Sequence, residues 1–473
     1  MAGSLSRVMA RMDNLYEFDR EPVDEKNLKP GRYFAGLFAG EHVAATEFVI
    51  GAFFVLHGVS FWDLVIGLAV GNLLAVLSWL FICAPIATRT RLTLYWYLRR
   101  IAGPGLTLIY NLAVAVLYCV LAGAMIAVSA TALGMAFGIP SPELTDIYPS
   151  SVGWVLITLA IGSVFTIVAI LGFEGLSRFA SVASPWIFVV FIAGAIASLP
   201  RLGVQSDLSN FLEVAQTQIW NGVPIEGQEK LGLWHVMFFA WFANLAMHVG
   251  LSDMALFRYA KHWGYGLYSG IGVFAGHYLA WICSGVMVAA IGRDMNPGLM
   301  AFEAVGIAGA FGVLLAGWTT ANPTLYRAGL ALQTMTPGWS RWKVTLLAGA
   351  ITTVLSCFPV IFMKLLDYVA LYGLTLMPIG AVVFSEHWIL PRLGIEQYQA
   401  EKYGWAFNWN ALIVWVGTLL LAFTALTSIH LYFRWLPSYV FAILVYTILQ
   451  YAVSSMDAFK KYRRVPGATT QRV

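Results

Sequence analysis

The sequence predicts an all-α, polytopic membrane protein with about twelve transmembrane helices. Of its 473 residues, 59% are hydrophobic and only 11% are charged, whereas a soluble domain carries about 25% charged residues. Apolar runs of about 20 residues, long enough to cross a bilayer, occupy nearly the whole chain. Lys and Arg gather in alternate connecting segments, as expected when these segments lie in the cytoplasm. The chain therefore has no room for a separate soluble domain, and we expect neither enzymatic activity nor a nucleic-acid partner.

The twelve expected spans follow one another with mostly short connections. Each corresponds to an apolar run near the length that a bilayer requires. They are 34–58, 63–87, 104–137, 151–173, 179–199, 232–251, 264–291, 301–323, 344–361, 366–386, 409–428 and 434–455.

The basic residues give these spans a direction. If the N-terminus is cytoplasmic, most Lys and Arg fall in cytoplasmic segments, and omitting one span would invert every later segment and destroy the bias. The cytoplasmic assignments include Arg89, Arg91, Arg99, Arg100, Arg258, Lys261, Arg327, Arg341 and Lys343. Both termini are thus expected in the cytoplasm, and the short loops and tails favour a bacterial inner membrane.

The first span contains ionisable residues in the run GLFAGEHVAATEFVIG. Glu41 and Glu47 are six positions apart, about 240° around a helix, so they cannot share one face. Charged groups within hydrocarbon are costly and usually mark a site or pathway. An unwound stretch around Glu41, His42 and Glu47 would expose these side chains and backbone carbonyls to a cavity.

The sixth span repeats this feature in FFAWFANLAMHVGLSD, which contains Asn244, His248, Gly250 and Asp253. Interrupted helices at matching positions of two halves are typical of inverted-repeat transporters. The side-chain types also permit a metal-site interpretation based on Glu41, His42, Glu47 and His248. Against that interpretation, the chain lacks HExxH and His-x3-His spacing.

Several longer motifs resemble the nucleobase–cation symporter family, also called the purine–cytosine permease family. They are GVSFWDLVIGLAVGNLL (58–74), IATRTRLTLYWYLRRIAGPGL (86–106), WTTANPTLYRAGLAL (318–332) and PIGAVVFSEHW (378–388). The resemblance implies a leucine-transporter type of fold, with two five-helix inverted repeats and two further helices. The implied division is a tail 1–33, repeats 34–199 and 232–386 around an extracellular loop 200–231, spans 387–455 and a tail 456–473.

The same resemblance implies a substrate site for a planar heterocycle at mid-membrane. A flat ring binds well between aromatic faces, with amide or carboxylate groups reading its edge. By family position, Tyr118 and Trp241 would form the ring platforms, with Phe242 as an alternative to Trp241. Many relatives have Trp at the position of Tyr118. Edge contacts would come from Asn322, Glu41, His42, Glu47 and His248.

The resemblance also implies a Na⁺ site where the unwound part of span 1 meets two hydroxyl residues of span 8. Thr319 and Thr320 match that pair, and backbone carbonyls from Ala45 to Phe48 would complete the oxygen ligands that a hard cation needs. Two alternatives remain open. The threonines could bond their own helix carbonyls, or Glu41 or Glu47 could carry a coupling proton.

The sequence thus predicts uptake of a nucleobase or related heterocycle, driven by Na⁺ or H⁺, by a monomer in the lipid bilayer. No cofactor is expected apart from the coupling ion. A symporter of the same fold for amino acids or another small solute is one alternative. An intramembrane metal-binding protein or enzyme built on the Glu41, His42, Glu47 and His248 cluster is the other.

Overall fold

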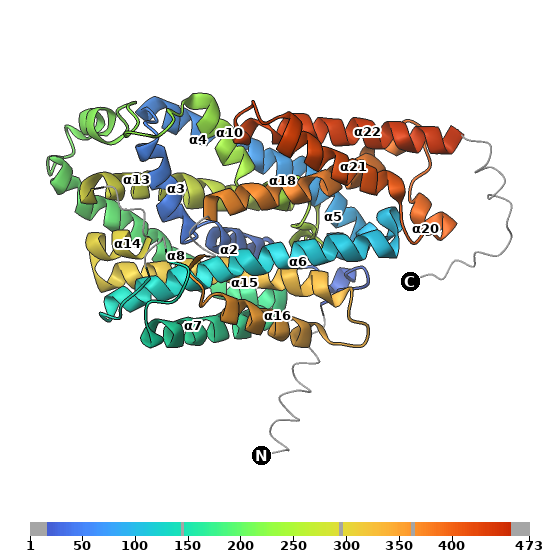
Figure 1. Ribbon diagram of the computed structural model, residues 1–473, viewed down its shortest axis with the longest axis horizontal. Helices are drawn as coiled ribbons and strands as arrows, with labels where there is room; N and C mark the ends of the chain where they lie inside the picture. Colours follow the sequence, from blue (N-terminus) through green and yellow to red (C-terminus); the bar gives the residue numbers. More distant parts are fainter. Residues whose placement is uncertain (1–16, 143–145, 293–296, 361–364, 456–473) are drawn as a thin grey trace, which may run out of the picture.

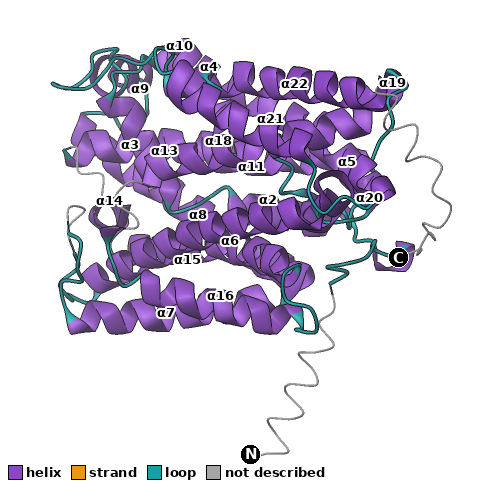
Figure 2. Ribbon diagram, turned by 45° about the vertical axis from the view of Figure 1, so that its right-hand side comes forward, coloured by secondary structure: helices purple, strands orange, loops and turns teal. Residues whose placement is uncertain are grey.

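The computed structural model describes residues 17–142, 146–292, 297–360 and 365–455. Sixteen residues of the expected N-terminal tail and the whole expected C-terminal tail, 456–473, lie outside this part of the chain. The described residues form a bundle of helices whose axes run along its length. In Figures 1 and 2, α6, α7, α15 and α16 lie side by side on one flank, and α21 and α22 lie on the opposite flank.

The principal helices and π-helical turns occur in the following order. They are α2 (Gly31–Glu41), α3 (Thr46–Leu56), α4 (Phe61–Ser78), η2 (Trp79–Cys83), α5 (Ala84–Thr90), α6 (Leu94–Ala136), α7 (Val152–Ile170), α8 (Gly172–Ser198), α9 (Phe211–Val214), α10 (Leu233–Phe242), α11 (Leu245–His248), α12 (Met254–Phe257), η6 (Ile271–Tyr278), α13 (Leu279–Ile291), α14 (Pro297–Val305), α15 (Ile307–Gln333), α16 (Arg341–Leu355), α18 (Leu365–Phe384), η7 (Ser385–Ile389), α19 (Leu390–Arg392), α20 (Gln399–Tyr403), α21 (Trp409–Leu420), η8 (Leu421–Ala425) and α22 (Trp435–Ser455).

Every expected span coincides with a helix or with an interrupted helix in this part of the chain. Seven helices are long and apolar enough to cross a membrane, and the bent pair α2 and α3 would be an eighth. The other four expected spans correspond to α10 with α11, to α15, to α16, and to α21 with η8. The predicted start of the eighth span was wrong, because a turn at Gly306 (φ 65°) separates α14 from α15.

Polar side chains set the starts of three long helices. Ser60, Thr93 and Ser151 accept hydrogen bonds from backbone N–H groups three residues later, at the first turns of α4, α6 and α7. These bonds satisfy donors that have no partner within the helix. The long helix α6 is kinked at Gly103, where φ is 79° and a Cβ would lie 2.4 Å from the carbonyl oxygen of Trp405. Only glycine suits this position.

The segment 17–30 crosses one end of the bundle, the right-hand end in Figure 1, and joins several helices. The Glu17 carboxylate accepts hydrogen bonds from the hydroxyls of Tyr259 (3.0 Å) and Tyr326 (2.5 Å). Arg20 donates to backbone carbonyls at the end of α15 and in the turn that follows, at 2.7 and 2.9 Å. Glu17 also accepts from the backbone N–H of Phe173, at the start of α8, at 3.0 Å. This segment therefore ties α8, α15 and the residues after α12 together.

Two further contacts belong to the same end. Lys29 donates to Glu174 at 2.8 Å, and this hydrogen bond lowers the pKa of the Glu174 carboxyl. Arg258, which the charge pattern placed in a cytoplasmic loop, is fully buried and donates to the carbonyl of Phe18 and to the hydroxyl of Tyr326. Arg258 lies between two expected spans, as predicted, but tertiary contacts enclose its guanidinium.

Candidate functional site

Two helix breaks face each other in the middle of the bundle. Residues 42–45 separate α2 from α3, whose axes differ by 54°. Two residues separate α10 from the single turn α11, and 249–253 follow before α12. Both interruptions fall where polar side chains predicted them. Carbonyl groups at a break lose their helical partners and become available to a side chain or ligand.

A buried ion network joins the two breaks. The guanidinium of Arg327 on α15 donates twice to the Glu41 carboxylate, at 2.6 and 3.1 Å, and once to Asp253. Asp253 also accepts a hydrogen bond from the indole N–H of Trp79 at 2.6 Å. The exposed fractions of Glu41, Asp253 and Arg327 are 5%, 0% and 0%. Two carboxylates with one guanidinium leave this cluster with one excess negative charge if all three are ionised.

The sequence interpretation missed the role of Arg327. It counted this residue among the cytoplasmic loop charges, whereas α15 continues to Gln333 and encloses Arg327 completely. The assignment was wrong because the apolar run was taken to end at 323. Two features could have indicated the site: Arg327 follows Thr320 by two helical turns on the same face, and a buried arginine normally pairs with carboxylates.

Glu47 has a different environment from Glu41. Its carboxylate accepts hydrogen bonds from the indole of Trp281 and from Thr46, at 3.1 Å in the second case. The Nε2 atom of His277 lies 3.8 Å from the same carboxylate. Glu47 is therefore a buried carboxylate with no Lys or Arg partner among the described residues. His277, on the helical turn η6, is its neighbour.

Three histidine rings lie between the carboxylates. The His42 ring centroid is 4.9 Å from that of His277 and 5.5 Å from Trp79, and His42 Nδ1 bonds the Phe38 carbonyl at 3.0 Å. His248 also packs edge-on against Trp79, with ring centroids 4.8 Å apart, and its Nε2 atom lies 2.9 Å from the carbonyl of Trp241. His42 and His248 thus both pack against Trp79, close to the two breaks.

A cavity lies between the two breaks and has aromatic walls with a few polar groups. Its volume is about 70 Å³, which is room for a few water molecules. The aromatic lining residues are Phe239, Phe242, Trp281, Tyr372 and Tyr432, and the polar ones are Glu41, Thr46, Glu47, Asn244, His277 and Thr320.

Five predicted substrate residues do not line this cavity. Two of them are His42 and His248, and the other three are Tyr118, Trp241 and Asn322. Tyr118 is fully buried with its ring 5.9 Å from Tyr372. Trp241 points toward α4 and α22, because its indole donates to Ser78 at 2.9 Å and packs edge-on against Trp435. Asn322 is buried on α15. The structure does not bring these three together at the cavity, whereas Phe242, the alternative to Trp241, lines it.

The two threonines of α15 differ in their contacts. Thr320 donates to the carbonyl of Glu41 at 3.3 Å across the first break, and also to its own helix. Thr319 donates only to carbonyls of its own helix among the described residues. Ala45 and Phe48, the expected carbonyl ligands, are fully buried close to the break. A hydroxyl opposite an interrupted helix provides oxygen ligands suited to a hard cation.

The four residues of the alternative metal interpretation do not meet at one point. Glu41 is occupied by Arg327, and within the described residues Glu41, His42, Glu47 and His248 form no cluster with metal-ligand spacing. The described part of the chain has one such cluster, formed by Glu229, His235 and His430, and it lies elsewhere.

Comparison with known proteins relates this architecture to membrane transporters. No protein-family model and no curated protein matches the sequence. The fold is similar to that of Mhp1, a nucleobase-cation-symport-1 family transporter solved in a closed conformation with bromovinylhydantoin bound. Their TM-score is 0.70 at 18% sequence identity, over 95% of this chain and 99% of that one. An inward-facing conformation of Mhp1 gives a TM-score of 0.69 over 94% and 98% of the two chains, again at 18% identity.

Two other transporters have the same overall fold. A substrate-bound, outward-open Na⁺-coupled sialic acid symporter matches with a TM-score of 0.65 at 14% identity, covering 95% of this chain and 97% of that one. A manganese transporter of Eremococcus coleocola matches with a TM-score of 0.56 at 14% identity, over 92% and 94%. The chain therefore has the fold of a multi-pass membrane transporter.

Proposed function

We propose that this protein is a secondary active transporter that couples uptake of a small planar heterocycle to Na⁺ or H⁺ by alternating access. The observation that carries the proposal is the cavity between two interrupted helices, lined by aromatic rings and a few convergent polar groups. The Mhp1-like fold supports it, because a relative of that fold holds a hydantoin derivative and another is Na⁺-coupled.

The cavity chemistry suits a flat, polar ring. Phe242, Trp281 and Tyr372 provide aromatic surfaces on which such a ring can stack or pack edge-on. Asn244 offers both a donor and an acceptor, and Glu47 offers an acceptor for a ring N–H. Because these groups lie at the cavity and Tyr118, Trp241 and Asn322 do not, they replace the latter three in the proposed substrate site.

The coupling ion is proposed to bind between α15 and the first break. Thr320 already bridges from α15 to the Glu41 carbonyl, so a Na⁺ ion there would hold α2 against α15. Substrate and ion would then share the first break: the ion would contact its backbone, and the substrate the side chains that follow.

Uptake into proteoliposomes tests this assignment, with a matched pair of variants. We expect Thr320→Ala to lower Na⁺-driven uptake of a radiolabelled heterocycle at least about tenfold, since an ion ligand is lost. Thr319→Ala should retain this uptake, because within the described parts of the chain its hydroxyl contacts only its own helix. Equal uptake by both variants under a Na⁺ gradient would contradict Na⁺ binding at Thr320.

Glu47→Gln tests the proton alternative in the same vesicles. If H⁺ is the coupling ion, this variant should exchange preloaded substrate normally but fail to accumulate it under a pH gradient. Normal accumulation would exclude Glu47 as the proton carrier. A panel of competitors, including nucleobases, hydantoins and amino acids, separates the heterocycle proposal from the amino-acid alternative. Competition by amino acids alone would overturn the heterocycle assignment.

The remaining assignments follow the charge pattern and stand as proposals. In a monomer built from the repeats 34–199 and 232–386, spans 1, 2, 6 and 7 would move against spans 3, 4, 8 and 9. Both termini would face the cytoplasm, and the host would be a bacterial inner membrane. Labelling of single cysteines introduced in 200–231 and in 88–93, with a membrane-impermeant reagent on intact cells, tests the orientation: only the former should react.

A further inference from the structure

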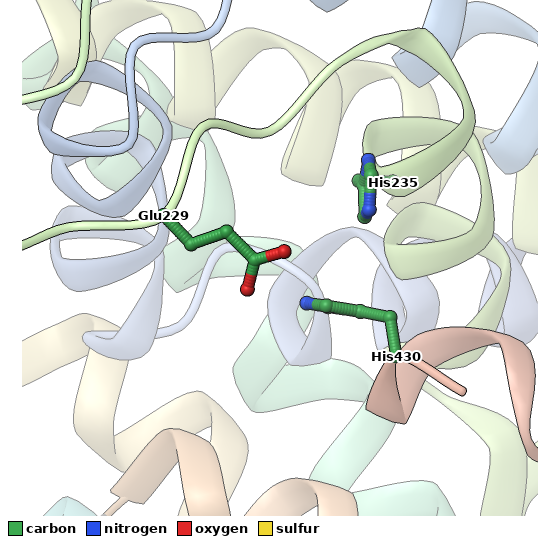
Figure 3. Close-up of side chains that lie close together, drawn as sticks. All are labelled: Glu229, His235 and His430. Atoms are coloured by element: carbon green, nitrogen blue, oxygen red, sulfur yellow. The ribbon is translucent and has the colours of Figure 1, made fainter. Parts of the chain in front are cut away.

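Two histidines and a glutamate converge at the end of the bundle opposite the segment 17–30. Glu229 lies in the loop before α10, His235 in the first turn of α10, and His430 in the connection between α21 and α22. Figure 3 shows the carboxylate directed toward the two rings. One ligand atom from each residue lies within 4.8 Å of those of the other two.

The spacing is close to that of a coordination sphere. Tetrahedral Zn²⁺ with bonds of about 2.0–2.1 Å places its ligand atoms roughly 3.4 Å apart. The three ligand atoms, which lie within 4.8 Å of one another, would have to move closer together by about 1 Å. Glu229 is exposed, so its flexible side chain can supply most of this movement. The two histidines are more firmly placed, because their rings pack edge-on with centroids 4.8 Å apart at 84°.

The hydrogen bonds of the two rings leave one nitrogen of each available. The Nδ1 atom of His235 accepts from the backbone N–H of Gly232 at 3.3 Å, and that of His430 accepts from Tyr432 at 3.4 Å. Neither Nε2 atom has a hydrogen-bond partner among the described residues. Metal binding at Nε2 would move the ring proton to Nδ1, and since both contacts are long, little hydrogen-bond energy is lost.

We propose that Glu229, His235 and His430 form a site for a divalent transition metal of the Zn²⁺ class, with a fourth position open to water. Two imidazoles and one carboxylate are a ligand set that such ions prefer over Na⁺, Mg²⁺ or Ca²⁺, which favour oxygen alone. The site is separate from the cavity and from the ionisable groups at the helix breaks.

The proposed metal site lies next to two residues of the cavity wall. His235 precedes the cavity residue Phe239 by one turn of α10, and His430 precedes the cavity residue Tyr432 by two positions. A bound ion would therefore fasten α10 to the connection before α22 and restrain the wall of the cavity. If the proposed transport function holds, occupancy of the site should slow uptake from that side.

Metal binding is measured first, on full-length protein purified without a histidine tag. Calorimetric titration with Zn²⁺ should give one site per chain. We expect Glu229→Gln and His430→Gln each to weaken binding at least about tenfold. His262→Gln is the matched control, because this exposed histidine lies outside the cluster. Because Glu229 is exposed, its variant keeps the test valid even if a histidine variant folds poorly.

Either of two results would overturn the metal site: no saturable Zn²⁺ binding by the parent protein, or equal affinity in Glu229→Gln and in the parent. Transport is measured separately. Inhibition of uptake by micromolar Zn²⁺ in the parent, absent in Glu229→Gln, would establish the restraint. Zn²⁺ binding without any effect on uptake would refute the restraint and leave the metal site intact, whereas absence of uptake altogether would refute the proposed function.

Discussion

Replacing Arg327 by Met should strongly destabilise the protein. The side chain makes three charge-assisted hydrogen bonds to Glu41 and Asp253, and its loss leaves two carboxylates buried with exposed fractions of only 5% and 0%. Breaking a buried ion pair in this way costs about 3–5 kcal/mol. Glu41→Gln should cost less, about 1–3 kcal/mol, because the pair of Arg327 with Asp253 survives.

The assay measures the free energy of unfolding as dodecyl sulfate is added to the protein in micelles of a mild detergent. Arg178→Met is the matched control: Arg178 also pairs with a glutamate, but its side chain is 70% exposed, so solvent screens the pair and its loss should change stability little. The triple change Arg327→Met, Glu41→Gln and Asp253→Asn should recover part of the loss, since no unpaired charge remains. If Arg327→Met alone is as stable as Arg178→Met, the network does not hold the two breaks together.

Three further predictions concern packing and the end of the bundle. Gly276→Ala should destabilise the protein by about 1–3 kcal/mol, because its Cβ would lie 2.4 Å from a backbone carbonyl oxygen of the first helix break. Gly417→Ala, with open space around the same atom, should be neutral or slightly stabilising in thermal unfolding. Glu17→Gln should loosen the segment 17–30 and speed its cleavage in limited proteolysis, and an unchanged rate would contradict a tethering role. Because Lys29 lowers the pKa of Glu174, their contact contributes stability above the ordinary carboxyl pKa of 4.5 and loses it as pH falls below that value. Acid should therefore speed the same cleavage, and Glu174→Gln should weaken this pH dependence.

The predictable part of the site was the position of the two helix breaks. Glu41, Glu47 and His42 in one span, and Asn244, His248 and Asp253 in another, are costly to bury on intact helices facing lipid, so the residue types alone indicated interruptions. The hydroxyl of Thr320 was predicted to face the first break from motif position, and it does contact the Glu41 carbonyl.

The partners of these residues could not be predicted in the same way. The hydropathy pattern reports whether a segment is apolar, but not which face of a helix meets its neighbour. Trp241 and Phe242 are adjacent in sequence and point to different surroundings, the former to α4 and α22 and the latter to the cavity. A rotation of one residue, about 100° on a helix, decides between these outcomes.

The sequence by itself determined that this chain is a bundle of apolar helices with two interruptions, because the bilayer requires long apolar runs and penalises charge within them. Only the tertiary structure decided which charges neutralise one another. Arg327 looked like a loop residue, yet it is the counter-ion of Glu41 and Asp253, and the histidines of the proposed metal site come from positions 235 and 430. Such pairs form between helices distant in the chain, and their attraction depends on distances of a few ångströms that no local pattern encodes.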